Sequence, residues 1–149
     1  MPNWCNNILT VKGEEDEIKH FELTAKKDDQ ELSLEKLYPC PIPIEKESPE
    51  TNIEKIANKL DYKAEDWYEW NTNNWGTKWD IKDATMDGNE YELIYTFDTA
   101  WSPPIKAIKN FSENFPSLVF ILEYDEPGGG FKGLAKIKNG SVEDHCIEY

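Results

Sequence analysis

The 149-residue sequence contains no arginine, so its 16 strongly basic side chains are all lysines. Without guanidinium groups, the chain has no bidentate fork for a carboxylate or phosphate and no arginine finger. Its 30 acidic residues give a formal net charge of −14. This charge repels phosphate backbones and anionic lipids, so we expect neither double-stranded nucleic acid nor a membrane as a partner. It favours a partner protein with a basic surface.

Cysteine and histidine are also scarce. Cys5, Cys40 and Cys146 form no paired framework, which is typical of reduced thiols in a cytoplasm. His20 and His145 are too few for a transition-metal site, and no Cys-x-x-Cys motif is present. No apolar run reaches the ~20 residues that a membrane-spanning helix needs, and the N-terminal residues do not resemble a signal peptide. We therefore expect a cytoplasmic protein of a bacterial cell, with no cofactor and no metal.

The sequence shows no catalytic constellation. Cys146 adjoins His145, but neighbouring residues of a strand point to opposite faces and would not form a thiolate–imidazolium pair. With so many acidic residues, any single pair of carboxylates is weak evidence for acid–base chemistry. We therefore expect a non-enzymatic protein, with an enzyme of unrecognised type that uses carboxylates as an alternative.

Hydrophobic periodicity predicts an α+β fold. The expected strands are residues 4–12, 77–82, 91–97, 118–124, 133–138 and 141–147, and the expected helices are 14–27, 53–60, 66–75 and 103–115. The segment 28–74 interrupts this order as a partly helical insertion. Without it, the order is the β-α-β-β-α-β core of ferredoxin-like folds, followed by a C-terminal β-hairpin. We expect residues 1–149 to form a single domain.

Three local signals refine this scheme. Residues 86–89 predict the turn of a hairpin, while Ser102 and Pro103 predict the N-cap and first position of a helix. The triglycine segment 128–130 leads into an expected strand and follows two acidic residues. A phosphate-binding loop would lead into a helix, so we interpret this segment as a connection or a bulge.

The most distinctive feature is a pair of polar, tryptophan-rich motifs, residues 71–80 and 99–102. One interpretation is that their indoles, including those of Trp79 and Trp101, fill the core. The other is an aromatic-walled cleft for a planar ligand or a peptide, with Asn74 and Lys78 as polar groups. Because Trp75 ends the polar insertion, we expect its ring to be partly exposed.

The same motifs carry a family resemblance. Met1–Leu9, Gly76–Asp80, Phe97–Pro104 and Phe115–Gly133 resemble, in order, the YubB-type ferredoxin-like family of plasmids and bacteriophages. This resemblance implies a ferredoxin-like fold without an iron–sulfur cluster and an origin in a mobile element. It implies no reaction and no catalytic residues.

These observations lead to a functional hypothesis. We expect an acidic binding protein of a phage or plasmid that acts on a host protein, with a host defence system as a candidate target. Its candidate binding residues are Asn74, Trp75, Lys78, Trp79 and Trp101. The alternative is a protein that sequesters a nucleotide or signal molecule in an aromatic cleft formed by the three tryptophans.

Overall fold

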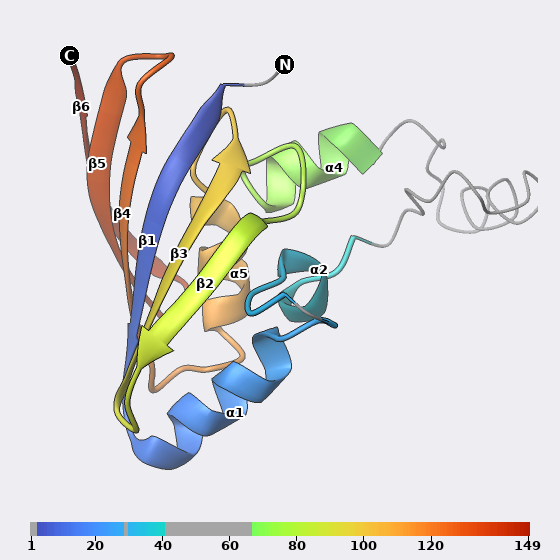
Figure 1. The fold of residues 1–149 in the computed structure, drawn as a ribbon, viewed down its shortest axis with the longest axis vertical. Helices are drawn as coiled ribbons and strands as arrows, with labels where there is room; N and C mark the ends of the chain where they lie inside the picture. Colours follow the sequence, from blue (N-terminus) through green and yellow to red (C-terminus); the bar gives the residue numbers. More distant parts are fainter. Residues whose placement is uncertain (1–2, 29, 41–66) are drawn as a thin grey trace, which may run out of the picture.

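Six strands form one antiparallel sheet in the computed structural model, which describes residues 3–28, 30–40 and 67–149. The described helices lie against one face of this sheet (Figure 1). In chain order the elements are β1 (Trp4–Lys12), α1 (Glu15–Ala25), α2 (Leu34–Leu37), α4 (Trp67–Asn74), β2 (Lys82–Gly88), β3 (Glu92–Ala100), α5 (Ile105–Ser112), β4 (Val119–Glu126), β5 (Phe131–Lys138) and β6 (Ser141–Glu148).

The strand order is β2-β3-β1-β4-β5-β6. Its first four strands, together with α1 and α5, form the predicted β-α-β-β-α-β core, and β5 and β6 add the predicted C-terminal hairpin. The α+β, ferredoxin-like fold class is therefore confirmed. The helix predicted at residues 53–60 lies outside the described residues, as does most of the predicted insertion.

Strand β1 lies at the centre of the core and has the alternating burial that its sequence predicted. Cys5 and Leu9 are fully buried beneath the helices, whereas Ile8 on the opposite face is 41% exposed. This is the alternation expected when only one face of a sheet is covered. From α1, Phe21 packs against the rings of Tyr95, Phe111, Phe115 and Phe120, with ring centroids 5.2–6.1 Å apart.

The prediction of a strand at residues 77–82 is wrong, because side chains replace the expected ladder of backbone hydrogen bonds. Thr77 Oγ1 donates to the carbonyl of Ala100 at 2.7 Å, and Asn71 Nδ2 donates to the carbonyl of Lys78 at 2.8 Å. The strand begins only at Lys82 and has an irregular register before Thr85.

Two further boundaries differ from the predictions. Ser102 does not cap a helix: its hydroxyl donates to the carbonyl of Gly76, and α5 begins at Ile105 without a side-chain cap. The hairpin turn follows residue 88 because Asn89 Oδ1 accepts hydrogen bonds from the amides of Tyr91 and Glu92. Such an asparagine turn stabilises a chain reversal in place of a backbone pair.

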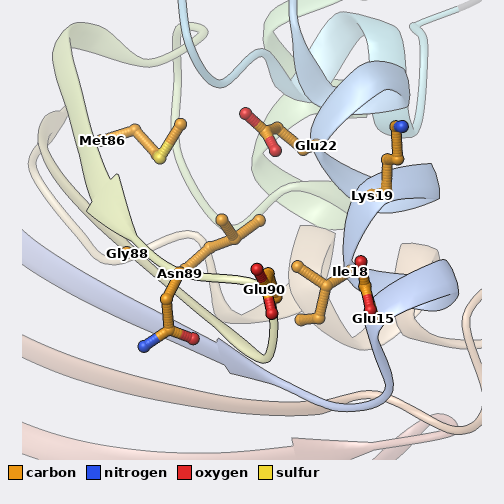
Figure 2. Close-up of a pocket in the computed structure, with 9 residues that line it drawn as sticks. Glu15, Ile18, Lys19, Glu22, Met86, Gly88, Asn89 and Glu90 are labelled. Carbon is orange, nitrogen blue, oxygen red and sulfur yellow. The ribbon is translucent and has the colours of Figure 1, made fainter.

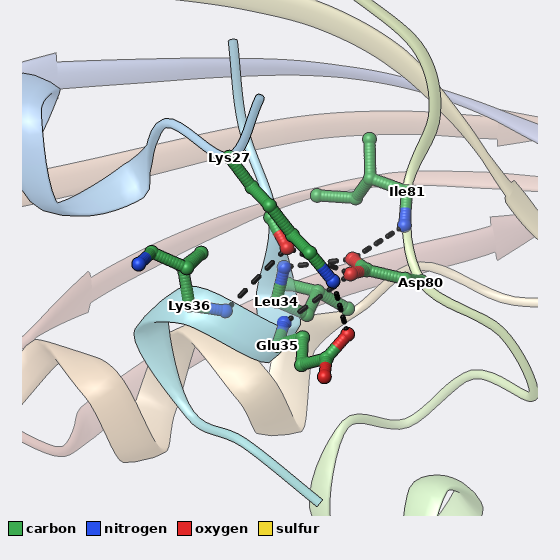
Figure 3. Close-up of polar contacts among 7 residues, drawn as sticks. Lys27, Leu34, Glu35, Lys36, Asp80 and Ile81 are labelled. Carbon is green, nitrogen blue, oxygen red and sulfur yellow. Dashed lines mark hydrogen bonds and ion pairs between the residues drawn. The ribbon is translucent and has the colours of Figure 1, made fainter. Parts of the chain in front are cut away.

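Asp80 ties the short helix α2 to the chain just before β2 (Figure 3). Its carboxylate accepts hydrogen bonds from the Leu34 amide at 2.7 Å, the Ser33 hydroxyl at 2.8 Å and the Glu35 amide at 3.3 Å. It also accepts from the amide of Ile81 at 2.7 Å. The negative charge therefore satisfies donors at the start of α2 that have no partner within the helix.

Asp80→Ala is expected to lower the free energy of unfolding by about 2 kcal/mol, because it removes a charged acceptor shared by several amides. Chemical denaturation measures this loss. Glu143→Ala on strand β6 removes the charge of an exposed side chain and serves as the control. Equal denaturation midpoints for the two variants would contradict the anchoring role of Asp80.

Burial sets the titration of Cys5 in β1. Desolvation, followed by the nearby charge of Glu126, raises the pKa of this thiol from 9.0 to about 12. In the unfolded chain the thiol ionises near its ordinary pKa, whereas the folded protein keeps it protonated. The contribution of Cys5 to stability is therefore complete below about pH 9 and is lost as the pH rises towards 12.

We predict that stability falls by about 1 kcal/mol between pH 9 and pH 10 through this single thiol. Urea denaturation at several pH values measures the slope, and Cys5→Ala is expected to make the slope shallower in that interval. An identical pH profile for the variant and the wild-type protein would contradict the assignment to Cys5.

Candidate functional site: the tryptophan corner

One end of the sheet brings together residues from distant parts of the sequence. Because β1 is antiparallel to both β3 and β4, its start lies beside the ends of those strands. Trp4 is opposite Ala100, and Asn6 is opposite Asp125. The α4–β2 loop and the β4–β5 turn lie at the same end (Figure 1). The motifs that contain the predicted binding residues meet at this end of the sheet.

Trp75 belongs to the core, so the prediction that its ring is partly exposed is wrong. Only 1% of its surface is accessible, and its indole Nε1 donates to the carbonyl of Tyr38 at 2.7 Å. The ring packs edge-on against Trp70, with centroids 5.9 Å apart. Asn74 is also occupied structurally, since its Nδ2 donates to the carbonyl of Trp70 at 3.0 Å.

Trp79 and Trp101 are on the surface, which excludes the interpretation that they fill the core. They are 38% and 47% exposed, respectively. With Trp75 buried, the three indoles do not line one common cleft. Lys78 is brought to the surface beside Trp79, with its Nζ 4.7 Å from the centroid of that ring.

Trp4 extends the exposed aromatic surface and was missed by the sequence analysis. Its ring centroid lies 6.3 Å from that of Trp79, and the Nζ of Lys82 lies 4.7 Å above the Trp4 ring. The position of Trp4 on the helix-free face of β1 was the available signal. We call Trp4, Lys78, Trp79, Lys82 and Trp101 the tryptophan corner.

Trp101 has an unusual backbone conformation. Its φ of +71° is in the left-handed region, which costs a bulky residue about 1–2 kcal/mol. Its amide donates to the carbonyl of Asn3 at 2.8 Å, which fixes the chain at this position. Because nearly half of the indole is exposed, burial of the ring only partly compensates for the strain.

A groove lies between α1 and the β2–β3 hairpin, away from the tryptophan corner (Figure 2). This groove has a volume of about 340 Å³. Its lining combines apolar and charged residues: Ile18, Met86 and Leu93, with Glu15, Glu22, Glu90 and Lys19 among the others. Three carboxylates against one ammonium group would repel the phosphates of a nucleotide.

The described residues offer little support for metal or thiol chemistry. Within residues 3–28, 30–40 and 67–149, no group of three or more His, Cys, Asp or Glu side chains could hold a metal ion. His145 and Cys146 are consecutive in β6 and pair with Leu134 and Gly133, so they face opposite sides as predicted. None of the helices in these ranges has the length and hydropathy that a bilayer-crossing helix requires.

Comparison with known proteins identifies the fold class and the family of the chain. The protein is a ferredoxin-like α+β protein: residues 74–149 match the family model described as the ferredoxin-like domain in Api92-like protein. The chain belongs to this Api92-like family. The crystal structure of protein api92 from Yersinia pseudotuberculosis is similar in fold, with a TM-score of 0.62 and 11% identity, over 100% of this chain and 98% of that chain. No curated protein sequence matches the chain.

The resemblance recognised from the motifs is therefore confirmed for the ferredoxin-like family. The matching family description names Api92-like proteins, while the YubB-type designation and the mobile-element origin stay predictions.

Trp75 is buried whereas Trp79 is partly exposed, so we expect their replacement by alanine to change stability by different amounts. Trp75→Ala is expected to cost about 3–5 kcal/mol of stability, as at other buried aromatic residues. Trp79→Ala should cost about 1 kcal/mol or less, since surface substitutions usually have small effects. Chemical denaturation of both variants measures the difference.

Trp75→Phe provides a milder control, because it keeps an aromatic ring in the core but leaves the carbonyl of Tyr38 without its donor. We expect it to cost about 1–3 kcal/mol, between the two alanine variants. Equal losses for Trp75→Ala and Trp79→Ala would contradict this description of the corner.

Proposed function

We propose that the protein is a non-enzymatic binding protein that holds a partner protein at the tryptophan corner. The observation that carries this proposal is Trp101, a strained and half-exposed indole. Strained backbone conformations cluster at functional sites, where the surrounding structure holds them in place. Tryptophan is also among the residues that dominate binding energy in protein interfaces.

A protein partner fits the corner better than a small planar ligand does. Lys78 and Lys82 each place an ammonium group over an indole, so one face of Trp79 and one face of Trp4 already have cationic partners. A stacking ligand would have to displace these groups. A protein surface can instead pack against the exposed edges and against Trp101. Sequestration of a nucleotide or signal molecule is therefore the less favoured alternative.

The charge of the molecule favours a basic partner. A net charge of −14 would attract a lysine- or arginine-rich surface over a distance. The sequence motifs extend the proposal to a cytoplasmic protein of a phage or plasmid. Its partner would then be a host protein, with a component of a defence system as a candidate.

Trp101→Gly tests this proposal without the ambiguity of a misfolded protein. Glycine adopts positive φ readily, so the strain is relieved while the indole is removed. We expect the free energy of unfolding to stay within about 1 kcal/mol of the wild-type value. Capture of partners from a lysate of host bacteria, quantified by mass spectrometry and followed by titration with the purified partner, is expected to fall at least tenfold.

Leu23→Ala is the matched control, because it removes an exposed apolar side chain from α1, away from the corner. It should retain full binding. A partner that binds Trp101→Gly and the wild-type protein equally well would overturn the proposal. Binding that does not weaken as salt rises would exclude a charge-driven association with a basic surface.

A further inference from the structure

Glu126, the last residue of β4, is a buried acidic residue. It is 3% exposed, and its Oε1 has no hydrogen-bond partner among the described residues. It also takes no part in the ion pairs of those residues, which join Lys12 to Glu92 and Lys27 to Glu35. Buried carboxylates are normally paired, since an uncompensated buried charge is strongly destabilising. An exception of this kind requires an explanation.

The triglycine turn lies directly against the carboxylate. A β-carbon at Gly129 would lie 2.5 Å from Glu126 Oε2, and one at Gly128 would lie 2.5 Å from Asn3 Cγ. Gly130 has a φ of +72° and donates its amide to the carbonyl of Glu126 at 2.9 Å. Side chains in this turn would collide with Glu126 or Asn3, so glycine at these positions lets the backbone lie close to the carboxylate.

The surroundings indicate which kind of group could bind there. A metal ion finds no cluster of three acidic, cysteine or histidine ligands within the described part of the chain. An anion would be repelled by Glu126 and by the adjacent Asp125. One unpaired oxygen suits a point-like ammonium donor better than the planar fork of a guanidinium group.

We propose that Glu126 beneath the triglycine turn receives the ammonium group of a lysine side chain from the partner protein. This inference rests on the proposed function, and it names a contact by which a basic partner would be recognised. Asn3 connects the two places: its carbonyl accepts from Trp101, and its side chain lies against Gly128. Glu126 would thus provide the ionic contact beside the aromatic contact of the tryptophan corner.

The experiment uses n-butylammonium chloride as an analogue of the lysine side chain and does not require the partner. Amide resonances of Gly128–Gly130 are followed by NMR while the salt is titrated at constant ionic strength. We expect saturable shifts in the wild-type protein and at least tenfold weaker binding to Glu126→Gln. Without ligand, Glu126→Gln is expected to melt a few degrees above the wild type, because a buried unpaired charge has been removed.

Glu123→Gln is the matched control: it makes the same chemical change on the same strand, at an exposed position on the helix-free face. It should bind butylammonium as the wild-type protein does. Butanol, the uncharged analogue, should produce no saturable shift. An equal response of Glu126→Gln, or equal responses to butanol or magnesium chloride, would overturn the site.

The two proposals can fail separately. If Trp101→Gly still binds the partner while butylammonium binding depends on Glu126, the proposed function fails and the ammonium site remains. If the partner needs Trp101 but binds Glu126→Gln as tightly as the wild-type protein, the role of Glu126 in recognition fails.

Discussion

The hydroxyl of Thr77 donates a hydrogen bond to the carbonyl of Ala100, and the arrangement of the sheet end depends on this contact. It holds the segment after α4 against the last residue of β3. The carbonyl of Trp75 accepts from the amide of Ala107 in α5 at 3.1 Å, which fixes the same segment to the neighbouring helix. A β-strand would have made these contacts through its backbone and alternated its side chains between the two faces. The side-chain contacts instead leave Lys78 and Trp79 at the surface while Trp75 enters the core.

The fold could be predicted from sequence because its main elements repeat local patterns. The alternation in β1 separates Leu9 from Ile8, and the spacing of Ile18 and Phe21 places both on the buried side of α1. These patterns depend only on which faces water can reach. The topology then followed from the order of elements, because antiparallel ferredoxin-like cores have few ways to connect them.

The same reasoning predicted which motifs contribute to the candidate site but not which of their indoles are exposed. Whether an indole is buried depends on an acceptor for its N–H group, and Trp75 finds one in Tyr38, 37 positions away in the sequence. The exposure of Trp101 follows from a left-handed backbone fixed by Asn3, from the far end of the chain. No local pattern contains such contacts. The motifs therefore predicted where tryptophans gather but wrongly predicted that the ring of Trp75 is partly exposed.

Similarity to api92 at 11% identity concerns the fold alone, so the sheet and its helices constrain few particular side chains. Asn3 and Trp4 lie outside the matched residues 74–149, yet Asn3 holds Trp101 and Trp4 faces Trp79. The exposed surface is thus assembled by β1 from both parts of the chain. Under the proposed function, substitutions at its few outward-facing side chains would change the preferred partner while Thr77 and the buried Trp75 keep the scaffold unchanged.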